Sequence, residues 1–92
     1  MDAIFEVGGE TCEVFGPRAR DITTDLELRE VNDELVAKIA DQIEDDGEPA
    51  EPIVLDEAEQ RQVLEVLDRF AAASPSLADD LQRLRELLRT QV

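Results

Sequence analysis

The sequence predicts a small α+β protein in which a short antiparallel sheet precedes three helices. Two runs with alternating apolar residues flank Gly8-Gly9, and a third alternating run follows over residues 22–29. From residue 32 onward, apolar residues recur every three or four positions instead. Alternation is typical of strands, and the longer spacing is typical of helices. A chain of 92 residues has room for one core, so we expect a single domain over residues 1–92.

Residues 3–15 are expected to form a β-hairpin. The Gly8-Gly9 pair suits a two-residue turn, because such turns need positive φ angles that glycine adopts freely. This turn fixes the register, with Phe5 opposite Cys12 and Ala3 opposite Val14. The predicted core face carries Ala3, Phe5, Val7, Cys12 and Val14, and the other face carries Ile4, Glu6, Thr11, Glu13 and Phe15.

After the hairpin, we predict a turn at Gly16-Pro17 and a third strand over residues 22–29. The strand is indicated by the alternation of polar residues with Ile22, Thr24, Leu26 and Leu28. A second interpretation starts a helix here, since Thr24 and Glu27 have the spacing of a capping box. We favour the strand, because a two-stranded hairpin is marginally stable alone and a third strand would complete a sheet.

Three helices are predicted, over residues 32–45, 56–73 and 75–90. Asn32 is a suitable N-cap for the first helix, and Gly47 is a suitable stop. The apolar stripes of all three helices predict that each packs one side against a core.

The second and third helices carry the clearest boundary signals. Asp56 and Glu59 have capping-box spacing, and Ser74-Pro75 is expected to end one helix and begin the next. Because this connection is short, the two helices are predicted to form an antiparallel helical hairpin. An ion-pair ladder is predicted on the outer side of the second helix, formed by Glu57, Arg61, Glu65 and Arg69.

The charge of the chain limits its partners. Asp and Glu number 24 against nine Lys and Arg, giving a net charge of −15. Such a surface repels phosphate backbones and anionic membranes, so we predict no nucleic-acid partner and no membrane partner. A basic protein would instead be attracted. Adaptation to a salt-rich environment is the other explanation for the composition.

Neither a targeting signal nor a membrane-spanning segment is expected from this sequence. No apolar run approaches the roughly 20 residues that span a bilayer. Residues 1–4 lack the basic and apolar regions of a signal peptide, so a cytoplasmic location is expected.

No catalytic apparatus is evident, and we predict neither an enzyme nor a cofactor. The chain has no histidine, which excludes imidazole bases and histidine ligands. Cys12 has no nearby cation in sequence and is interpreted as a small buried apolar residue. Arg18 and Arg20 are expected to pair with the protein's own carboxylates.

An acidic patch is predicted at Glu44, Asp45, Asp46 and Glu48. An EF-hand register placed on Gly47 puts Ile53 at the position that requires a bidentate glutamate, so that motif fails. We therefore expect a solvated acidic loop and no specific metal site.

The sequence favours a non-catalytic protein-interaction or regulatory module that self-associates, most simply as a homodimer. A single small core is expected to leave some apolar side chains uncovered, and uncovered patches mark interfaces. The predicted interface comprises Ile4, Phe15, Leu77, Leu81, Leu84 and Leu88. The alternative hypothesis is an acidic inhibitor that mimics DNA, of the anti-restriction, nuclease-immunity or anti-CRISPR kind, and binds a basic nucleic-acid-binding protein.

Overall fold

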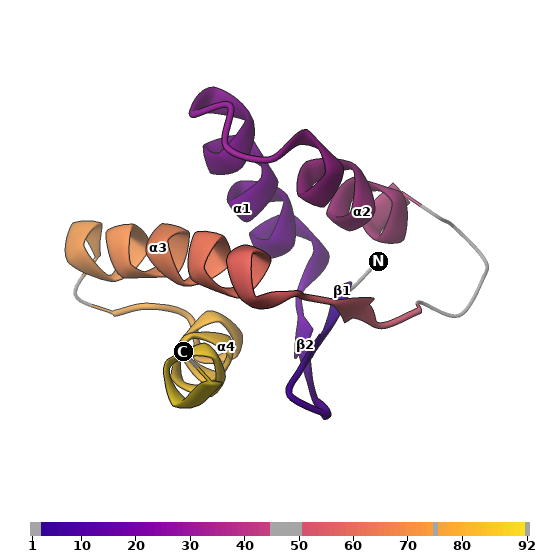
Figure 1. Cartoon of the computed structure of the whole chain (residues 1–92). Coiled ribbons are helices and arrows are strands. Elements are labelled where there is room, and N and C mark those ends of the chain that lie inside the picture. Colours follow the sequence, from indigo (N-terminus) through magenta and orange to yellow (C-terminus); the bar gives the residue numbers. More distant parts are fainter. Residues whose placement is uncertain (1–2, 45–50, 75, 92) are drawn as a thin grey trace.

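The chain folds into a three-stranded sheet and four helices within residues 3–44, 51–74 and 76–91, which the computed structural model describes (Figure 1). This arrangement confirms the predicted α+β class. The elements in chain order are β1 (Ala3–Val7), β2 (Glu10–Val14), α1 (Gly16–Leu28), α2 (Asp33–Glu44), β3 (Ile53–Val54), α3 (Glu57–Ala73) and α4 (Asp79–Gln91).

The predicted hairpin and its register are confirmed. Strands β1 and β2 pair antiparallel, with Phe5 opposite Cys12 and Ala3 opposite Val14. Gly8 and Gly9 have φ angles of 57° and 84°, the signs that a type I′ turn requires. The predicted core face is buried, whereas Phe15 follows β2 and is 51% exposed.

The third strand is not the one predicted. Residues 22–29 form no strand. The third strand of the sheet is β3, which pairs parallel with β1. Phe5 lies beside Ile53, and the backbone N–H of Leu55 extends the pairing by donating to the carbonyl of Glu6 over 3.2 Å. The sheet is therefore mixed, in the order β2-β1-β3.

Helix α1 replaces both the predicted turn at Gly16-Pro17 and the predicted strand. Pro17 lies in the first helical turn, where a proline's missing N–H costs no hydrogen bond. Ile22 and Leu26 are buried and lie four residues apart, a spacing that fits one helix face as well as one strand face. The capping-box interpretation is also wrong, because Thr24 lies inside α1 and its hydroxyl donates to the carbonyl of Arg20.

The predicted starts of the next two helices are confirmed. Asn32 caps α2 by accepting from the N–H of Leu35 over 3.2 Å. Asp56 and Glu59 form both hydrogen bonds of the capping box at the start of α3. Two rungs of the predicted ladder on α3 are also present, Arg61–Glu57 at 2.8 Å and Arg69–Glu65 at 3.3 Å.

The predicted third helix begins later than expected. Ser74 ends α3 in an extended conformation, and α4 begins at Asp79. Leu77 and Ala78 precede α4 and pack against the core. This longer connection lets the helices cross steeply instead of forming the predicted antiparallel hairpin: Figure 1 shows α4 almost end-on where α3 lies across the view.

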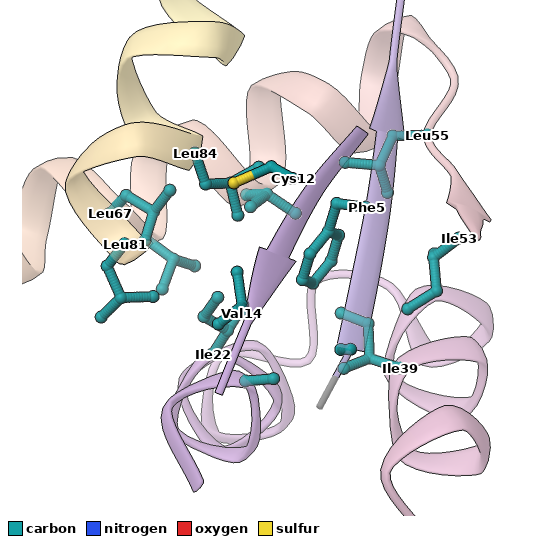
Figure 2. Packing of buried hydrophobic residues seen from close by; sticks show 14 of the residues in the cluster. Phe5, Cys12, Val14, Ile22, Ile39, Ile53, Leu55, Leu67, Leu81 and Leu84 are labelled. Carbon is teal, nitrogen blue, oxygen red and sulfur yellow. The ribbon is translucent and has the colours of Figure 1, made fainter. Parts of the chain in front are cut away.

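One hydrophobic core joins the buried face of the sheet to all four helices. Figure 2 shows Cys12 and Val14 of β2 on the side of the sheet that faces Leu81 and Leu84 of α4. The opposite face of the sheet remains half-buried or exposed at Ile4, Glu6 and Val54. The helices therefore cover one face of the sheet and form a second layer.

Candidate binding groove

A groove of about 530 Å³ lies between α1 and the corner where α3 passes into α4. Its volume falls within the roughly 300–1,000 Å³ that is usual for binding sites. It is open to solvent, since Leu28 on its wall is 81% exposed. The groove is lined by apolar side chains (Leu28, Phe70, Ala73, Leu77, Ala78 and Leu81) and by polar ones (Arg18, Asp21, Thr24, Asp25, Ser74 and Ser76).

One wall of the groove is a stripe of α1. Arg18, Asp21, Asp25 and Leu28 are spaced by three and four residues, so they share one side of the helix. The buried residues of α1, among them Ile22, lie on a different side. Helix α1 therefore contacts the core with one side and presents a second side to the groove.

Asp80 stabilises the end of the groove that lies at the start of α1. Its carboxylate accepts from the N–H of Phe15 over 2.9 Å and from the guanidinium of Arg18 over 3.0 Å. It also accepts from the N–H of Leu81, in the first turn of α4. These bonds tie the end of β2 and the start of α1 to the start of α4.

The electrostatics of Asp80 follow from these contacts. Partial burial raises the pKa of the Asp80 carboxyl, but the hydrogen bonds from Phe15, Arg18 and Leu81 and the charge of Arg18 outweigh burial. The net result is a pKa below the ordinary value for aspartate. The guanidinium of Arg18 also lies 5.3 Å from the ring centroid of Phe15, within cation–π range.

Asp25 fixes the other side of the groove by joining α1 to α3. Its carboxylate accepts from the guanidinium of Arg69 and lies 3.2 Å from that of Arg29. Because Arg69 is only 27% exposed, this contact is shielded more than most surface ion pairs. With Asp80 and Asp25 each engaged, the two walls of the groove are held in place without a ligand.

Asp21 is the acidic residue on the wall that remains available. It is exposed, and within the residues that the structure describes it forms no ion pair. Arg18 and Asp25, which flank it on the same stripe, are both engaged by other side chains. A ligand in the groove would therefore meet one free negative charge at Asp21.

The structure divides the predicted interface. Leu81, Leu84 and Leu88 are buried in the core, so they offer no free surface, although Leu81 reaches the floor of the groove. Leu77 is half-buried and lines the groove. Ile4 is half-buried on the outer face of the sheet, and Phe15 is exposed at the start of α1. These six residues do not form one surface.

Sequence reasoning missed Leu28 and Phe70 as groove residues. The predicted strand over residues 22–29 includes Leu28, and Phe70 is not among the predicted interface residues. The signal was available in a helical interpretation of residues 16–28, because Leu28 then falls outside the stripe formed by Ala19, Ile22 and Leu26. A large apolar residue off the buried stripe of a helix indicates a second contact surface.

The predicted acidic patch falls mostly outside the described residues. This applies to Asp45, Asp46 and Glu48, and of Glu44 only the helical backbone is described. Among the residues that are described, no group of three Cys, Asp or Glu side chains could hold a metal ion.

Cys12 is buried, as predicted. Burial raises the pKa of its thiol, the nearby charge of Arg83 opposes that rise, and the charge of Asp80 adds to it. The thiol lies 3.9 Å from the carbonyl oxygen of Asp80. A buried thiol with a raised pKa is a poor nucleophile.

Arg18 was predicted to pair with a carboxylate of the protein itself, and it does so with Asp80.

In the part of the chain that the structure describes, no helix has both the length and the apolarity to cross a membrane.

Comparison of the chain with known protein families, characterised proteins and solved structures gave no significant match.

Proposed function

We propose that this chain is a non-catalytic protein-interaction module and that the groove between α1, α3 and α4 is its binding surface. The observation that supports this most strongly is an open apolar groove whose walls are already fixed by the Asp80 and Asp25 contacts. A preformed site loses little conformational entropy when it binds, which favours affinity.

The shape of the groove favours a segment of a protein over a small molecule. Pockets for small molecules enclose most of the ligand surface. Here Leu28 is largely exposed, and the wall runs along α1 from Arg18 to Leu28. At about 1.5 Å per residue, these ten steps span roughly 15 Å, which suits a short peptide element.

Self-association receives less support from the positions of the leucines in the fold than from the sequence alone. The leucines at positions 81, 84 and 88 belong to the core, so two copies would have to meet at the groove or at separate exposed residues such as Phe15 and Val54. Two copies that met there would each bring a net charge of −15, which opposes their approach. We therefore propose a different protein as the partner.

The acidic-inhibitor alternative stays a second hypothesis. Exposed carboxylates occur on the hairpin and on every helix, for example Glu10, Asp21, Asp41, Glu65 and Glu86. A mimic of a nucleic-acid backbone would concentrate them in one stripe, whereas adaptation to salt spreads them. This distribution favours salt adaptation.

The proposal is tested by selecting peptides from a displayed random library on the immobilised protein. The selected peptides are then titrated against wild type, Leu28→Ser and Val54→Ser. Val54 is the matched control, because it is 61% exposed but lies on the outer face of the sheet. We expect Leu28→Ser to weaken binding by about tenfold, as for an interface anchor, and Val54→Ser to leave it unchanged.

Changes in amide chemical shifts on peptide binding provide the second measurement. The residues whose amides shift should include Asp21, Phe70 and Leu77. If no peptide is selected, or if the selected peptides bind Leu28→Ser as tightly as wild type, the groove is not the binding surface.

A further inference from the structure

We propose that the groove accepts a cationic amphipathic helix from a partner protein. This inference rests on the proposed function and specifies the partner. It combines three features of the groove: its apolar floor, the absence of a strand edge among its lining residues, and the free carboxylate of Asp21 within a strongly negative protein.

The lining residues indicate that the ligand is helical. All of them belong to α1, α3, α4 or the connection between the last two helices, so the groove offers no open strand edge. A peptide bound there in an extended conformation would bury backbone N–H and C=O groups without partners, which is costly. A helix satisfies those groups internally and presents apolar side chains at intervals of three and four residues.

The apolar residues of the groove are placed to contact the apolar stripe of a bound helix. Leu28 lies on the α1 wall, Phe70 on the α3 wall, and Leu77 on the connection that leads into α4. The wall length of roughly 15 Å corresponds to about three turns of helix. A ligand helix of that length places about three or four apolar residues on one face.

The charges indicate that the ligand is basic. Arg18 is engaged by Asp80, and Asp25 is engaged by Arg69 and Arg29. Among the described residues, this leaves the charge of Asp21 without an ion-pair partner on the wall. A Lys or Arg beside the apolar stripe of the ligand would pair with Asp21. The net charge of −15 would also accelerate the approach of a cationic ligand and slow that of an acidic one.

The test uses three labelled helical peptides of about 15 residues with one leucine stripe and different polar positions: all Lys, all Gln or all Glu. Binding is measured by fluorescence anisotropy at low and at high NaCl. The variants are Asp21→Asn, Leu28→Ser and Asp41→Asn. Asp41 is the matched control, since it is an exposed acid on α2 outside the groove and its substitution removes the same charge.

We expect the Lys peptide to bind at least about tenfold more tightly than the Gln peptide at low salt, with the advantage falling at high salt. Asp21→Asn should weaken the binding of the Lys peptide by about threefold more than Asp41→Asn does. It should leave the affinity for the Gln peptide unchanged. Leu28→Ser should weaken the Lys and Gln peptides alike, because both bury the leucine stripe.

Equal binding of the Lys, Gln and Glu peptides at the groove would overturn the cationic ligand while leaving the proposed function intact. Equal effects of Asp21→Asn and Asp41→Asn would also overturn it, because Asp21 would then act only through net charge. Binding that is insensitive to Leu28→Ser would remove the groove and the proposed function together. Sedimentation that shows a dimer with groove amides shifting on dilution would assign the groove to a second copy of the chain.

Discussion

Asp80 joins parts of the chain that lie more than sixty residues apart. Its carboxylate accepts hydrogen bonds from Phe15, Arg18 and Leu81, and these contacts lower its pKa despite the opposing effect of burial. A carboxyl whose pKa is lower in the folded state than in the unfolded state stabilises the fold in its ionised form. That stabilisation is complete above the ordinary pKa of about 3.9 and is lost as the pH falls through the lower folded value.

Asp80→Asn should therefore destabilise the protein at neutral pH by about 1–3 kcal/mol, as expected for hydrogen bonds to a charged group. The difference from wild type should shrink as the pH falls below about 4, because Asp80 then takes up a proton in the unfolded chain more readily than in the folded protein. Urea unfolding at pH 7 and near pH 3 would measure this difference, with Asp41→Asn as the control. A gap of the same size at both pH values would mean that the charge of Asp80 contributes nothing.

Glu30 adopts an unusual backbone conformation at the end of α1. Its φ angle is 52°, in the left-handed region that favours glycine. The N–H of Glu30 donates to the carbonyl of Glu27, and the N–H of Val31 donates to that of Leu26. These two bonds form a Schellman motif, in which the position of Glu30 is usually occupied by glycine.

Glu30→Gly is expected to stabilise the protein by about 0.5–1 kcal/mol. Relief of left-handed strain is worth roughly 1–2 kcal/mol, and the greater freedom of glycine in the unfolded chain offsets part of that gain. Thermal melting would measure the effect. Glu30→Gln is the control, because it removes the same charge and keeps the strain; equal melting temperatures for the two variants would contradict this explanation.

Among the elements, α4 is the helix on which the C-terminal half of the core depends. Leu84 is fully buried, and α4 packs against both α3 and β2. The outer side of α3 is different, since Glu65 is exposed and pairs with Arg69, one turn along the same helix.

Leu84→Asp should cost several kcal/mol and should prevent stable folding, because it places an unpaired charge in the core. Glu65→Ala should cost about 0–1 kcal/mol, as for other exposed ion pairs. Denaturant midpoints measured by circular dichroism would compare the two variants. Similar midpoints would mean that α4 is not docked on the core.

For the whole molecule, net charge is the dominant electrostatic property. The ion pairs of α1 and α3 are local, whereas the excess of fifteen negative charges acts across the surface. In the compact state these charges repel one another, and dissolved ions screen that repulsion.

Raising NaCl from about 0.05 M to 1 M should therefore raise the melting temperature, since the Debye length falls from above 10 Å to about 3 Å. A variant with Glu10, Glu27 and Asp41 changed to their amides should show a smaller rise, because less repulsion remains to be screened. Differential scanning calorimetry would provide the melting temperatures. A flat or falling curve for wild type would mean that local pairing dominates.

Features that depend on neighbouring residues were predictable from the sequence. The hairpin register follows from Gly8-Gly9, and the start of α3 follows from Asp56 and Glu59. The buried face of the hairpin could also be assigned, because alternation fixes which side chains share a face. Of the groove, only Leu77 and Leu81 were among the predicted interface residues.

Tertiary contacts decided the rest. Residues 22–29 carry a pattern that suits a strand or a helix, and contacts of α1 with distant partners, such as Asp25 with Arg69, stabilise the helix. Strand β3 has only two residues and almost no local signal; its place is fixed by pairing with β1. The sequence by itself determined the elements that short-range hydrogen bonds specify. The tertiary structure decided which apolar residues are buried and which line the groove, because burial depends on where α1 and α4 dock.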